Sequence, residues 1–575
     1  MSVLATLIAL ALGSLIYLSY RALPKPLPGI PYNRPSARRG WGDLPSLIAH
    51  YRETGELTSF AFEQCRKLGS PVVQLFLWPL ARRPVVVLDD PRETEDVLLR
   101  RTEEFGRSPA SASGLASVLH PLSLEGGVMG FLEDGMSQEF LQRSIAPMVH
   151  RCAEELVELW RKKCDLSRGR PFEALGDILL ATFDAVWVVL LGDRGTSGLR
   201  NEITATVVDR AGQDDGEWDE DYGSDDLDQP VQFRGAARSA VYRAVEHLSG
   251  SSTSIVWLLF PRLRSWLRWL MPQFRYYKVA RDREIGRLVA EARKQVEKEV
   301  RDDVAAVGGG SDTCLLDLVL GRPVVGHEKT ENHSSALSDR AVRDSLALLL
   351  AAAHETTAIT LAWAVKILTN NQAEQSLLRE ALRAAFSSVP STSTPSVTDI
   401  LTSSIPYLDA TLEEILRLAN PIPLLSRTAT ADAVLLGCPI PKDTPVLCNP
   451  QFVREPLSDV PEEKRSESSQ QAWRLRKGRG FVTQDLDKFV PERWVTADAD
   501  GKERFDPEAL TRLHFGMGER RCLGRELAMQ LIRIFLVILV WNFELDTLPD
   551  ALNSQLAEGS ILRWPQQCYV RLEKI

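Results

Sequence analysis

The segment HFGMGERRCLG, residues 514–524, constrains the chain more than any other stretch of its sequence. Cys522 lies between Gly518 and Gly524, two residues after Arg520, and an apolar run of helical length follows. Glycines let the backbone turn with positive φ or approach a flat ring closely. The amino-terminal end of a helix stabilises a thiolate, and an arginine can pair with a carboxylate. The segment therefore predicts a thiolate ligand for a large planar cofactor, because an inert buried cysteine needs none of these neighbours.

The full spacing F-x-x-G-x-R-x-C-x-G resembles the haem-thiolate signature of the cytochrome P-450 monooxygenases. The resemblance implies haem b as the cofactor and Cys522 as the axial ligand of its iron, where a thiolate favours O–O cleavage. It implies further cofactor contacts from the remaining signature residues, Phe515, Gly518, Arg520 and Gly524. The fold that it implies is mainly α with small β-sheets (α+β).

Three charged residues upstream match other motifs of the same family. Glu414 and Arg417 are three residues apart in the apolar stretch LEEILRL, so they can pair on one helix face. The stretch FVPERW resembles the family's PERF element, whose arginine here is Arg493. The resemblance implies a buried structural triad of these residues, in which loss of one member of a buried pair costs about 3–5 kcal/mol.

The stretch LALLLAAAHETTAITLAWAV is apolar around almost the whole helix circumference, which predicts a buried helix. A glutamate there is costly unless it is paired, hydrated or functional. AAHETT at 352–357 resembles the family's distal-helix motif and implies that Glu355 and Thr356 are catalytic. Thr356 would bond a carbonyl one turn back and hold water, and Glu355 would relay protons. Ala353 stands where the family usually has glycine, but alanine is small enough that we still expect turnover.

HETT also begins the zinc-protease pattern H-E-x-x-H, but position 358 is alanine, so the second ligand is missing. We therefore expect His354 to be a core or pocket-lining histidine.

Two more arginines are assigned by resemblance. Arg427 follows PIPLLS and is similar to a haem-propionate arginine of the family, with a surface arginine as the alternative. Arg143 lies in QEFLQRSIAP, where relatives often have W-x-x-x-R, but no tryptophan is found at that spacing. The haem contact expected of Arg143 therefore rests on the arginine of this motif alone.

Residues 3–20 carry no charge, and as a helix they would span about 27 Å, roughly a bilayer core. Basic residues follow this run, which keeps the remaining chain cytoplasmic. We expect a membrane anchor at 1–22, a proline-rich hinge at 23–45 and a catalytic domain at 46–575. Similarity to microsomal members of filamentous fungi implies single-pass insertion in the endoplasmic reticulum. The alternative is a cleaved signal peptide, but no basic region precedes the run and no A-x-A site follows it.

Hydrophobic spacing elsewhere predicts mostly helices. Residues 71–90 predict a β-hairpin, and Pro91 is typical of a helix start. Helical spacing fills most of 136–212, 235–249, 277–300, 338–385 and 398–419. A second β-rich region covers 428–449, and low-complexity loops are expected at 305–313, 386–397 and 455–479.

Composition excludes several other classes of protein. A net charge of −9 without a basic face argues against nucleic acid as a partner. Eight scattered cysteines without a C-x-x-C pair indicate neither a zinc site nor a disulfide framework. The acidic run 214–228 predicts a solvated insertion. The Trp-, Leu- and Arg-rich segment 254–277 suits either a surface element in lipid headgroups or an amphipathic helix packed on the core.

The expected function follows from the resemblance: insertion of one oxygen atom from O₂ into a lipophilic small molecule of secondary metabolism. The pocket would be lined by 106–130, 205–260 and 421–426. Alternatives are a haem-thiolate isomerase or dehydratase that needs no reductase, and a non-catalytic haem or lipid carrier on the membrane.

The chain contains no flavin or nicotinamide fingerprint, so electrons must come from a partner. We expect an NADPH-dependent cytochrome reductase, with cytochrome b5 as a possible second donor. Five arginines around the cysteine segment form a local basic patch that can dock an acidic partner, namely Arg512, Arg520, Arg521, Arg525 and Arg533.

Overall fold

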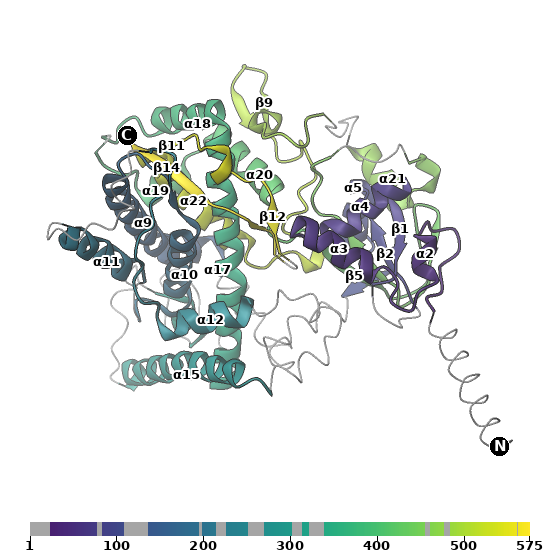
Figure 1. Ribbon diagram of the computed structural model, residues 1–575, viewed down its shortest axis with the longest axis horizontal. Coiled ribbons are helices and arrows are strands. Elements are labelled where there is room, and N and C mark those ends of the chain that lie inside the picture. The colour runs from purple at the N-terminus through teal and green to yellow at the C-terminus, as the bar shows by residue number, and fades with distance from the viewer. Residues whose placement is uncertain are drawn as a thin grey trace.

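Two regions of different secondary structure lie side by side, a helical body and a smaller sheet-containing region (Figure 1). The computed structural model describes residues 23–77, 83–107, 136–194, 198–213, 226–250, 270–301, 313–320, 338–390, 392–454, 460–476, 484–559 and 562–575. The predicted anchor (1–22) lies outside these residues, as do most of the expected pocket loop, the acidic run and the segment 254–269.

The sheet-containing region is built on a five-stranded sheet of order β1-β2-β8-β5-β3. The predicted hairpin is present, because β1 (Val72–Leu75) pairs antiparallel with β2 (Val85–Leu88). Every residue of both strands is buried, which fits their many valines (VVQL and VVVL). The other strands are β3 (Phe105–Arg107), β5 (Leu425–Ala429) and β8 (Pro445–Cys448). Only the pairing of β2 with β8 is parallel.

Short helices cover this sheet and connect it to the rest of the chain. They are α2 (Arg34–Ala37), α3 (Leu44–Thr54), α4 (Ser59–Leu68) and α5 (Pro91–Leu99). Asp90 caps α5, because its carboxylate accepts a hydrogen bond from the Glu93 amide at 2.8 Å. Pro91 occupies the first helical position, as its fixed φ favours.

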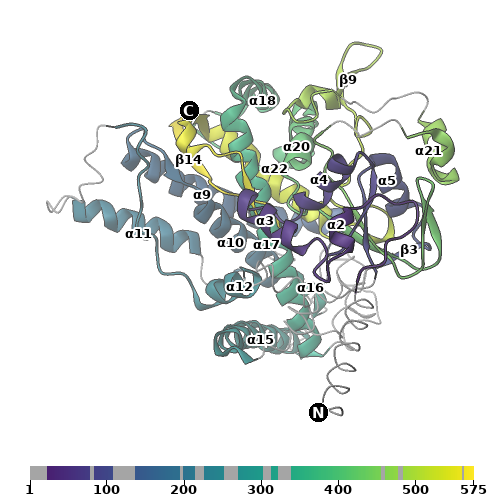
Figure 2. The same ribbon diagram turned by 45° about the vertical axis from the view of Figure 1, so that its right-hand side comes forward.

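The helical body surrounds α17 (Asp339–Asn370), which runs through the centre of the molecule in both ribbon views (Figures 1 and 2). The helices that pack directly on it include α10 (Leu175–Leu191), α15 (Pro272–Arg301), α20 (Pro406–Ala419) and α22 (Arg525–Asn542). Among the described residues, α17 is the one helix long and apolar enough to cross a membrane, and most of that apolar stretch is buried in the body. Its apolarity therefore reflects a central position in the core, as predicted.

The remaining helices are α8 (Gln138–Phe140), the π-helix η2 (Leu141–Ile145), α9 (Ala146–Ser167), α11 (Gly198–Gln213), α12 (Ala240–Gly250), α16 (Leu315–Val319), α18 (Gln372–Ala385), α19 (Val397–Thr402), η5 (Pro491–Trp494), η6 (Gly518–Arg520) and η7 (Asp550–Leu552). A second sheet joins β4 (Phe172–Glu173), β11 (Phe543–Asp546) and β14 (Tyr569–Lys574). Three two-stranded pairs are β6 (Ala433–Leu435) with β7 (Cys438–Ile440), β9 (Val495–Ala497) with β10 (Glu503–Phe505), and β12 (Ala557–Glu558) with β13 (Trp564–Pro565). The expected mainly helical fold with small sheets is confirmed.

The prediction of a low-complexity loop over 455–479 is wrong for its middle. The chain forms the short helix η4 (Glu462–Lys464) and then α21 (Glu467–Leu475). Ser466 caps α21 by accepting a hydrogen bond from the Ser469 amide at 3.2 Å. The serines therefore mark a helix start here rather than a flexible stretch.

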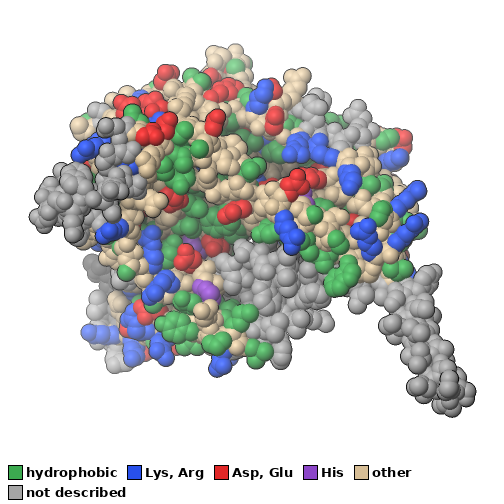
Figure 3. All heavy atoms as spheres, viewed as in Figure 1, with side chains coloured by type: hydrophobic (Ala, Val, Ile, Leu, Met, Phe, Trp, Pro, Cys, Tyr) green, Lys and Arg blue, Asp and Glu red, His purple; other side chains and the backbone are tan. Residues whose placement is uncertain are grey.

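Hydrophobic side chains gather in two places on the face drawn in Figure 3, toward its centre and at its lower edge, where α15 lies. The residues around the start of α15 include exposed apolar side chains, among them Leu270 at 59% and Tyr276 at 67% exposure. At least this described end of the segment 254–277 is therefore on the surface.

Candidate active site

Cys522 lies in the turn between η6 and α22, and the backbone of this turn is held at several points. The amide of Cys522 donates to the Phe515 carbonyl at 2.7 Å, and the amide of Gly516 donates to the Leu513 carbonyl at 2.8 Å. Gly518 has φ +70°, and a Cβ there would come within 2.6 Å of the Leu98 carbonyl at the end of α5. Only glycine fits that position.

The thiol of Cys522 is open to solvent on one side. Of the eight cysteines, all within the described residues, Cys522 alone is exposed. Burial by the protein on its other sides raises the pKa of the thiol. A hydrogen bond from the Gly524 backbone and the positive charge of Arg525 lower it, but burial has the larger effect. A metal ion bound to the sulfur would reverse that direction, because a coordinating thiol is deprotonated.

The surroundings of the thiol fit a planar cofactor that carries carboxylates. Arg520 is exposed, and within the part of the chain that the structure describes its guanidinium has neither a hydrogen-bond nor an ion-pair partner. At Gly524 a Cβ would meet no atom within 4 Å, so space is open beside the sulfur. Phe515 packs against the main hydrophobic cluster and makes an edge contact with the His514 ring at 5.1 Å. A thiolate donor, a free cation and open space thus lie within a few residues of one another in the chain.

Glu355 and Thr356 lie on the one open side of the central helix. The less buried residues on this stretch of α17 are Leu348, Leu349, Ala351, Ala352, Ala353, Glu355 and Thr356, whereas Leu350, His354 and Thr357 are buried. The hydroxyl of Thr356 donates to the Ala352 carbonyl at 2.9 Å, the bond expected one turn back. Since that bond uses the hydroxyl proton, the oxygen keeps lone pairs for a further hydrogen bond. The methyl of Ala353 packs against the main hydrophobic cluster.

His354 is a core residue, as predicted. Its side chain is buried, and Nδ1 lies 2.9 Å from the Leu350 carbonyl. The ring also makes an edge contact with Phe183 at 5.6 Å. Burial lowers the pKa of His354 to about 4, so the imidazole is neutral near pH 7.

The predicted ion-pair triad is present. Glu414 is 0% exposed, and its carboxylate accepts from Arg417 Nε at 2.9 Å and from Arg493 Nε at 3.0 Å. Sequence reasoning missed a further donor, Trp494 Nε1, at 2.8 Å. Burial raises the pKa of Glu414, but the two arginines and the indole outweigh it and leave the pKa below its ordinary value. The triad therefore holds α20 to η5 and to the loop before it.

A second buried carboxylate, also missed, ties α20 to the cysteine segment. Glu413 accepts from Arg512 at 3.1 Å and lies 3.2 Å from His514 Nε2. Burial raises the pKa of Glu413, but His514 and Arg512 outweigh this effect and lower it. The adjacent glutamates in LEEILRL could have indicated this contact. Neighbouring helix residues point in different directions, so the two carboxylates can bind two different segments. One carboxylate holds the loop before η5, and the other holds the segment leading to Cys522.

The two arginines assigned by partial motifs lie in different settings. Arg427 is buried in β5, so the alternative of a surface arginine is wrong. One of its nitrogens donates to the Ser426 carbonyl at 3.0 Å. Arg143 is exposed on η2 and pairs with Glu139 at 2.8 Å. Its haem contact stays a prediction.

The basic patch expected around the cysteine segment is smaller than predicted. Arg533 donates to the carbonyls of Ile400 at 2.8 Å and Ser403 at 2.9 Å and pairs with Asp409, so it joins α22 to α19 and α20. These partners use three of the five N–H donors of Arg533, and its side chain is only 13% exposed, which disfavours its predicted place on a docking surface. Arg512 likewise pairs with Glu413, as described above.

Comparison with known proteins gives a consistent result. A family model described as cytochrome P-450 matches residues 47–455 and 484–571. The cytochrome P-450 monooxygenase TRI13 of Fusarium sporotrichioides is 30% identical over 588 residues, covering 97% of this chain and 97% of that protein. The cytochrome P-450 monooxygenase GME11363 of Pestalotiopsis microspora is 31% identical, with 99% of this chain and 98% of that protein covered. The crystal structure of the cytochrome P450DA heme domain, 18% identical, has a similar fold, with a TM-score of 0.62 over 96% of this chain and 98% of that chain.

Proposed function

The chain belongs to the cytochrome P-450 family and is a monooxygenase of that family, and on this premise we propose that it inserts one oxygen atom of O₂ into a lipophilic small molecule of secondary metabolism. The observation that carries the proposal is the environment of Cys522. Cys522 is the one exposed cysteine, and open space lies at Gly524, two residues after it. Arg520, two residues before it, is exposed, and among the described residues its guanidinium has no hydrogen-bond or ion-pair partner.

Haem bound through Cys522 would supply activation of O₂ by iron with a thiolate ligand. Cys522 would hold the iron, with the Gly524 amide and the start of α22 stabilising the thiolate. Arg520 would pair with a carboxylate at the edge of the cofactor. Arg427, which is buried in β5, is proposed for the same kind of contact.

Thr356 and Glu355 would manage protons on the open side of α17. The hydroxyl of Thr356 donates its hydrogen bond to the Ala352 carbonyl, so its oxygen is oriented to accept a hydrogen bond from water in the pocket. Glu355 can carry a proton between that water and solvent. The overall reaction consumes the substrate C–H bond, O₂, two electrons and two protons, and it yields the alcohol and water.

The two electrons would come from NADPH through a flavoprotein reductase, with cytochrome b5 as a possible second donor. Arg521 and Arg525 are proposed as docking residues. Arg521 is exposed and without an ion pair among the described residues, and Arg525 has only a surface pair with Glu526. Arg521→Glu should raise the apparent KM for reductase, whereas an unchanged KM would exclude this docking surface.

We place the catalytic domain (46–575) on the cytoplasmic side of the endoplasmic reticulum, held by the anchor at 1–22 through the hinge at 23–45. The support is the uncharged run 3–20 with basic residues after it. The exposed apolar side chains at the start of α15 suit a second contact with lipid. Retention of the full chain in microsomes after alkaline extraction, and its release when 1–22 is deleted, would test the anchor.

The function is tested by two matched threonine variants in a reconstituted system with reductase and NADPH. Thr356→Val removes the hydroxyl on the open face of α17. Thr357→Val removes a buried hydroxyl that makes the same kind of bond, to the Ala353 carbonyl at 2.7 Å. We expect Thr356→Val to divert NADPH consumption into peroxide, while Thr357→Val stays coupled. Product formation that needs neither reductase nor NADPH, and that is unchanged in Thr356→Val, would favour a reductase-independent isomerase or dehydratase.

A further inference from the structure

A structured segment of the chain lies between the two stretches that match the cytochrome P-450 family model. The model matches residues 47–455 and 484–571 and omits 456–483. The described part of that segment, 460–476, contains η4 and α21 and lies beside α5 in both ribbon views (Figures 1 and 2). We call residues 460–476 the clamp.

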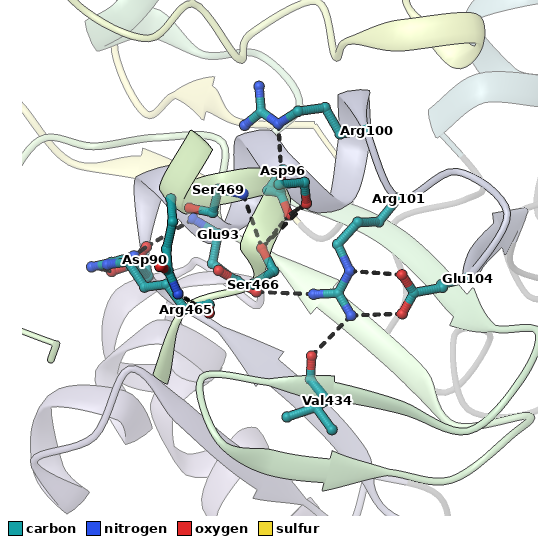
Figure 4. Close-up of polar contacts among 12 residues, drawn as sticks. Asp90, Glu93, Asp96, Arg100, Arg101, Glu104, Val434, Arg465, Ser466 and Ser469 are labelled. Carbon is teal, nitrogen blue, oxygen red and sulfur yellow. Dashed lines mark hydrogen bonds and ion pairs between the residues drawn. The ribbon is translucent and has the colours of Figure 1, made fainter. Parts of the chain in front are cut away.

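The clamp holds the first turn of α5 through a buried ion pair. Arg465 donates two hydrogen bonds to the carboxylate of Asp90, at 2.8 and 2.9 Å (Figure 4). Both side chains are nearly buried, at 7% and 5% exposure. Asp90 is also the residue that caps α5, so the clamp fixes the charge that starts this helix.

The clamp also binds the middle of α5. The hydroxyls of Ser466 and Ser468 donate to Asp96 Oδ2 at 2.5 and 2.7 Å, and Asp96 is 0% exposed. On the outer side, the guanidinium of Arg92 lies 4.3 Å from the centre of the Trp473 ring. Ser466, the residue that caps α21, therefore also binds α5 through Asp96.

A third contact extends from the clamp to the segment that carries Cys522. Arg476 donates to Glu95 Oε2 at 2.8 Å, and the hydroxyl of Thr511 donates to the same oxygen at 3.2 Å. Thr511 lies at the start of the segment 511–524. One carboxylate oxygen of α5 thus joins the clamp to the cysteine segment.

The far end of α5 meets the same segment directly. The Leu98 carbonyl occupies the space that a Cβ at Gly518 would need. A shift of α5 would therefore move the turn that precedes Cys522.

The acidic residues of α5 explain why this helix needs the clamp. Asp90, Glu93, Glu95 and Asp96 lie within seven residues and are all largely buried. Buried like charges at this spacing repel unless cations or donors offset them. Arg100 and Arg101 of the same helical region supply part of that charge, and the clamp supplies Arg465 and Arg476.

We propose that the clamp is a positioning element for the cysteine ligand, acting through α5 on residues 511–524. The inference rests on the proposed function, since it assigns Cys522 to the cofactor. It predicts that breaking the clamp loosens the cysteine segment before it affects the rest of the fold.

The experiment compares Arg476→Met and Thr511→Val with Arg474→Met. Arg474 is exposed on the same helix, and its side chain has no hydrogen bond or ion pair among the described residues, so it is the matched control. Amide hydrogen exchange is followed in residues 511–524 and, for reference, in α9. Loss of a hydrogen bond to a charged group should raise the equilibrium constant for local opening about tenfold or more. We expect exchange in 511–524 to accelerate about tenfold in the two test variants and to remain unchanged in Arg474→Met. Arg476→Lys should restore part of the protection.

The carbon monoxide spectrum of the reduced, haem-loaded proteins gives the second readout. We expect part of the thiolate-type band to move to the shorter-wavelength band in Arg476→Met and Thr511→Val only. Exchange in 511–524 equal to that of the wild type, or acceleration spread equally over α9, would overturn the clamp as a positioning element. Absence of the thiolate band in the wild type would instead contradict the proposed function and leave the exchange comparison to decide on the clamp itself.

Discussion

Replacement of Glu414 by glutamine tests the buried framework behind the cysteine segment. The carboxylate accepts hydrogen bonds from Arg417, Arg493 and the Trp494 indole, and from the Val490 amide at 3.1 Å. Glutamine keeps the size but loses the charge and turns one acceptor into a donor. The glutamine NH₂ group would then face one of the N–H donors of this site, and the buried position leaves no water to separate them.

The expected loss of stability depends on which hydrogen bonds Arg417 and Arg493 keep in the Glu414→Gln variant. Removing one member of a buried ion pair costs about 3–5 kcal/mol. Arg417 would still donate to the Leu486 carbonyl at 2.6 Å, and Arg493 to the Asp485 carbonyl at 2.8 Å. We therefore expect a loss of about 3 kcal/mol in the free energy of unfolding, at the lower end of that range.

The assay is urea unfolding of the anchor-deleted protein, with Glu526→Gln as the control. Glu526 pairs with Arg525 on the surface, where such pairs contribute about 0–1 kcal/mol. Equal midpoints for Glu414→Gln and Glu526→Gln would refute the assignment of a structural role to the triad.

The same variant has a pH signature with a definite sign. The pKa of Glu414 is lowered in the folded protein, so its stabilising contribution is present above the ordinary glutamate pKa of about 4.3. It is lost as the pH falls through the lower folded-state value. The difference between wild type and Glu414→Gln should therefore be constant near neutral pH and shrink only in acid.

Two further predictions concern glycines and a buried acid. Gly518→Ala should destabilise the cofactor-free protein by about 1–2 kcal/mol or more, because φ is +70° and the new Cβ meets the Leu98 carbonyl. Gly524→Ala should leave that stability unchanged but weaken haem retention. Thermal unfolding measures the first effect, and haem titration measures the second. Burial raises the pKa of Glu93 to about 7, so the contribution of this one group to stability falls as pH rises from about 4 to about 7. The stability of Glu93→Gln relative to wild type should therefore increase over that range. A difference that does not change with pH would contradict the assignment.

Local chemistry made the cysteine segment and the triad predictable. Cys522 is surrounded in sequence by residues that each have one physical reason to be there, and Glu414 pairs with an arginine one turn away. The central helix was predictable as well, since apolar residues on nearly every face leave burial as the one stable outcome. In each case the partners are close in sequence or the pattern is continuous.

The parts that could not be predicted depend on residues far apart in the chain. Glu413 meets His514 across about a hundred residues, and Glu95 joins Arg476 to Thr511 across still larger separations. The sequence predicts a loop for the clamp, whereas Ser466 caps α21 through the Ser469 amide and its hydroxyl also bonds Asp96, which is 370 residues away in the chain. Arg533 was placed on the surface because a basic residue near others suggests a patch, whereas its carbonyl partners come from α19 and its end.

The central claim is that Cys522 is a thiolate ligand of haem iron. It is tested most directly by the absorption spectrum of the dithionite-reduced, anchor-deleted protein with and without carbon monoxide, for the wild type and for Cys522→Ala. We predict the strongly red-shifted Soret band of a thiolate-bound ferrous carbonyl in the wild type and its loss in Cys522→Ala. Well-folded wild-type protein that takes up no haem, or that shows only the shorter-wavelength carbonyl band, would contradict the claim.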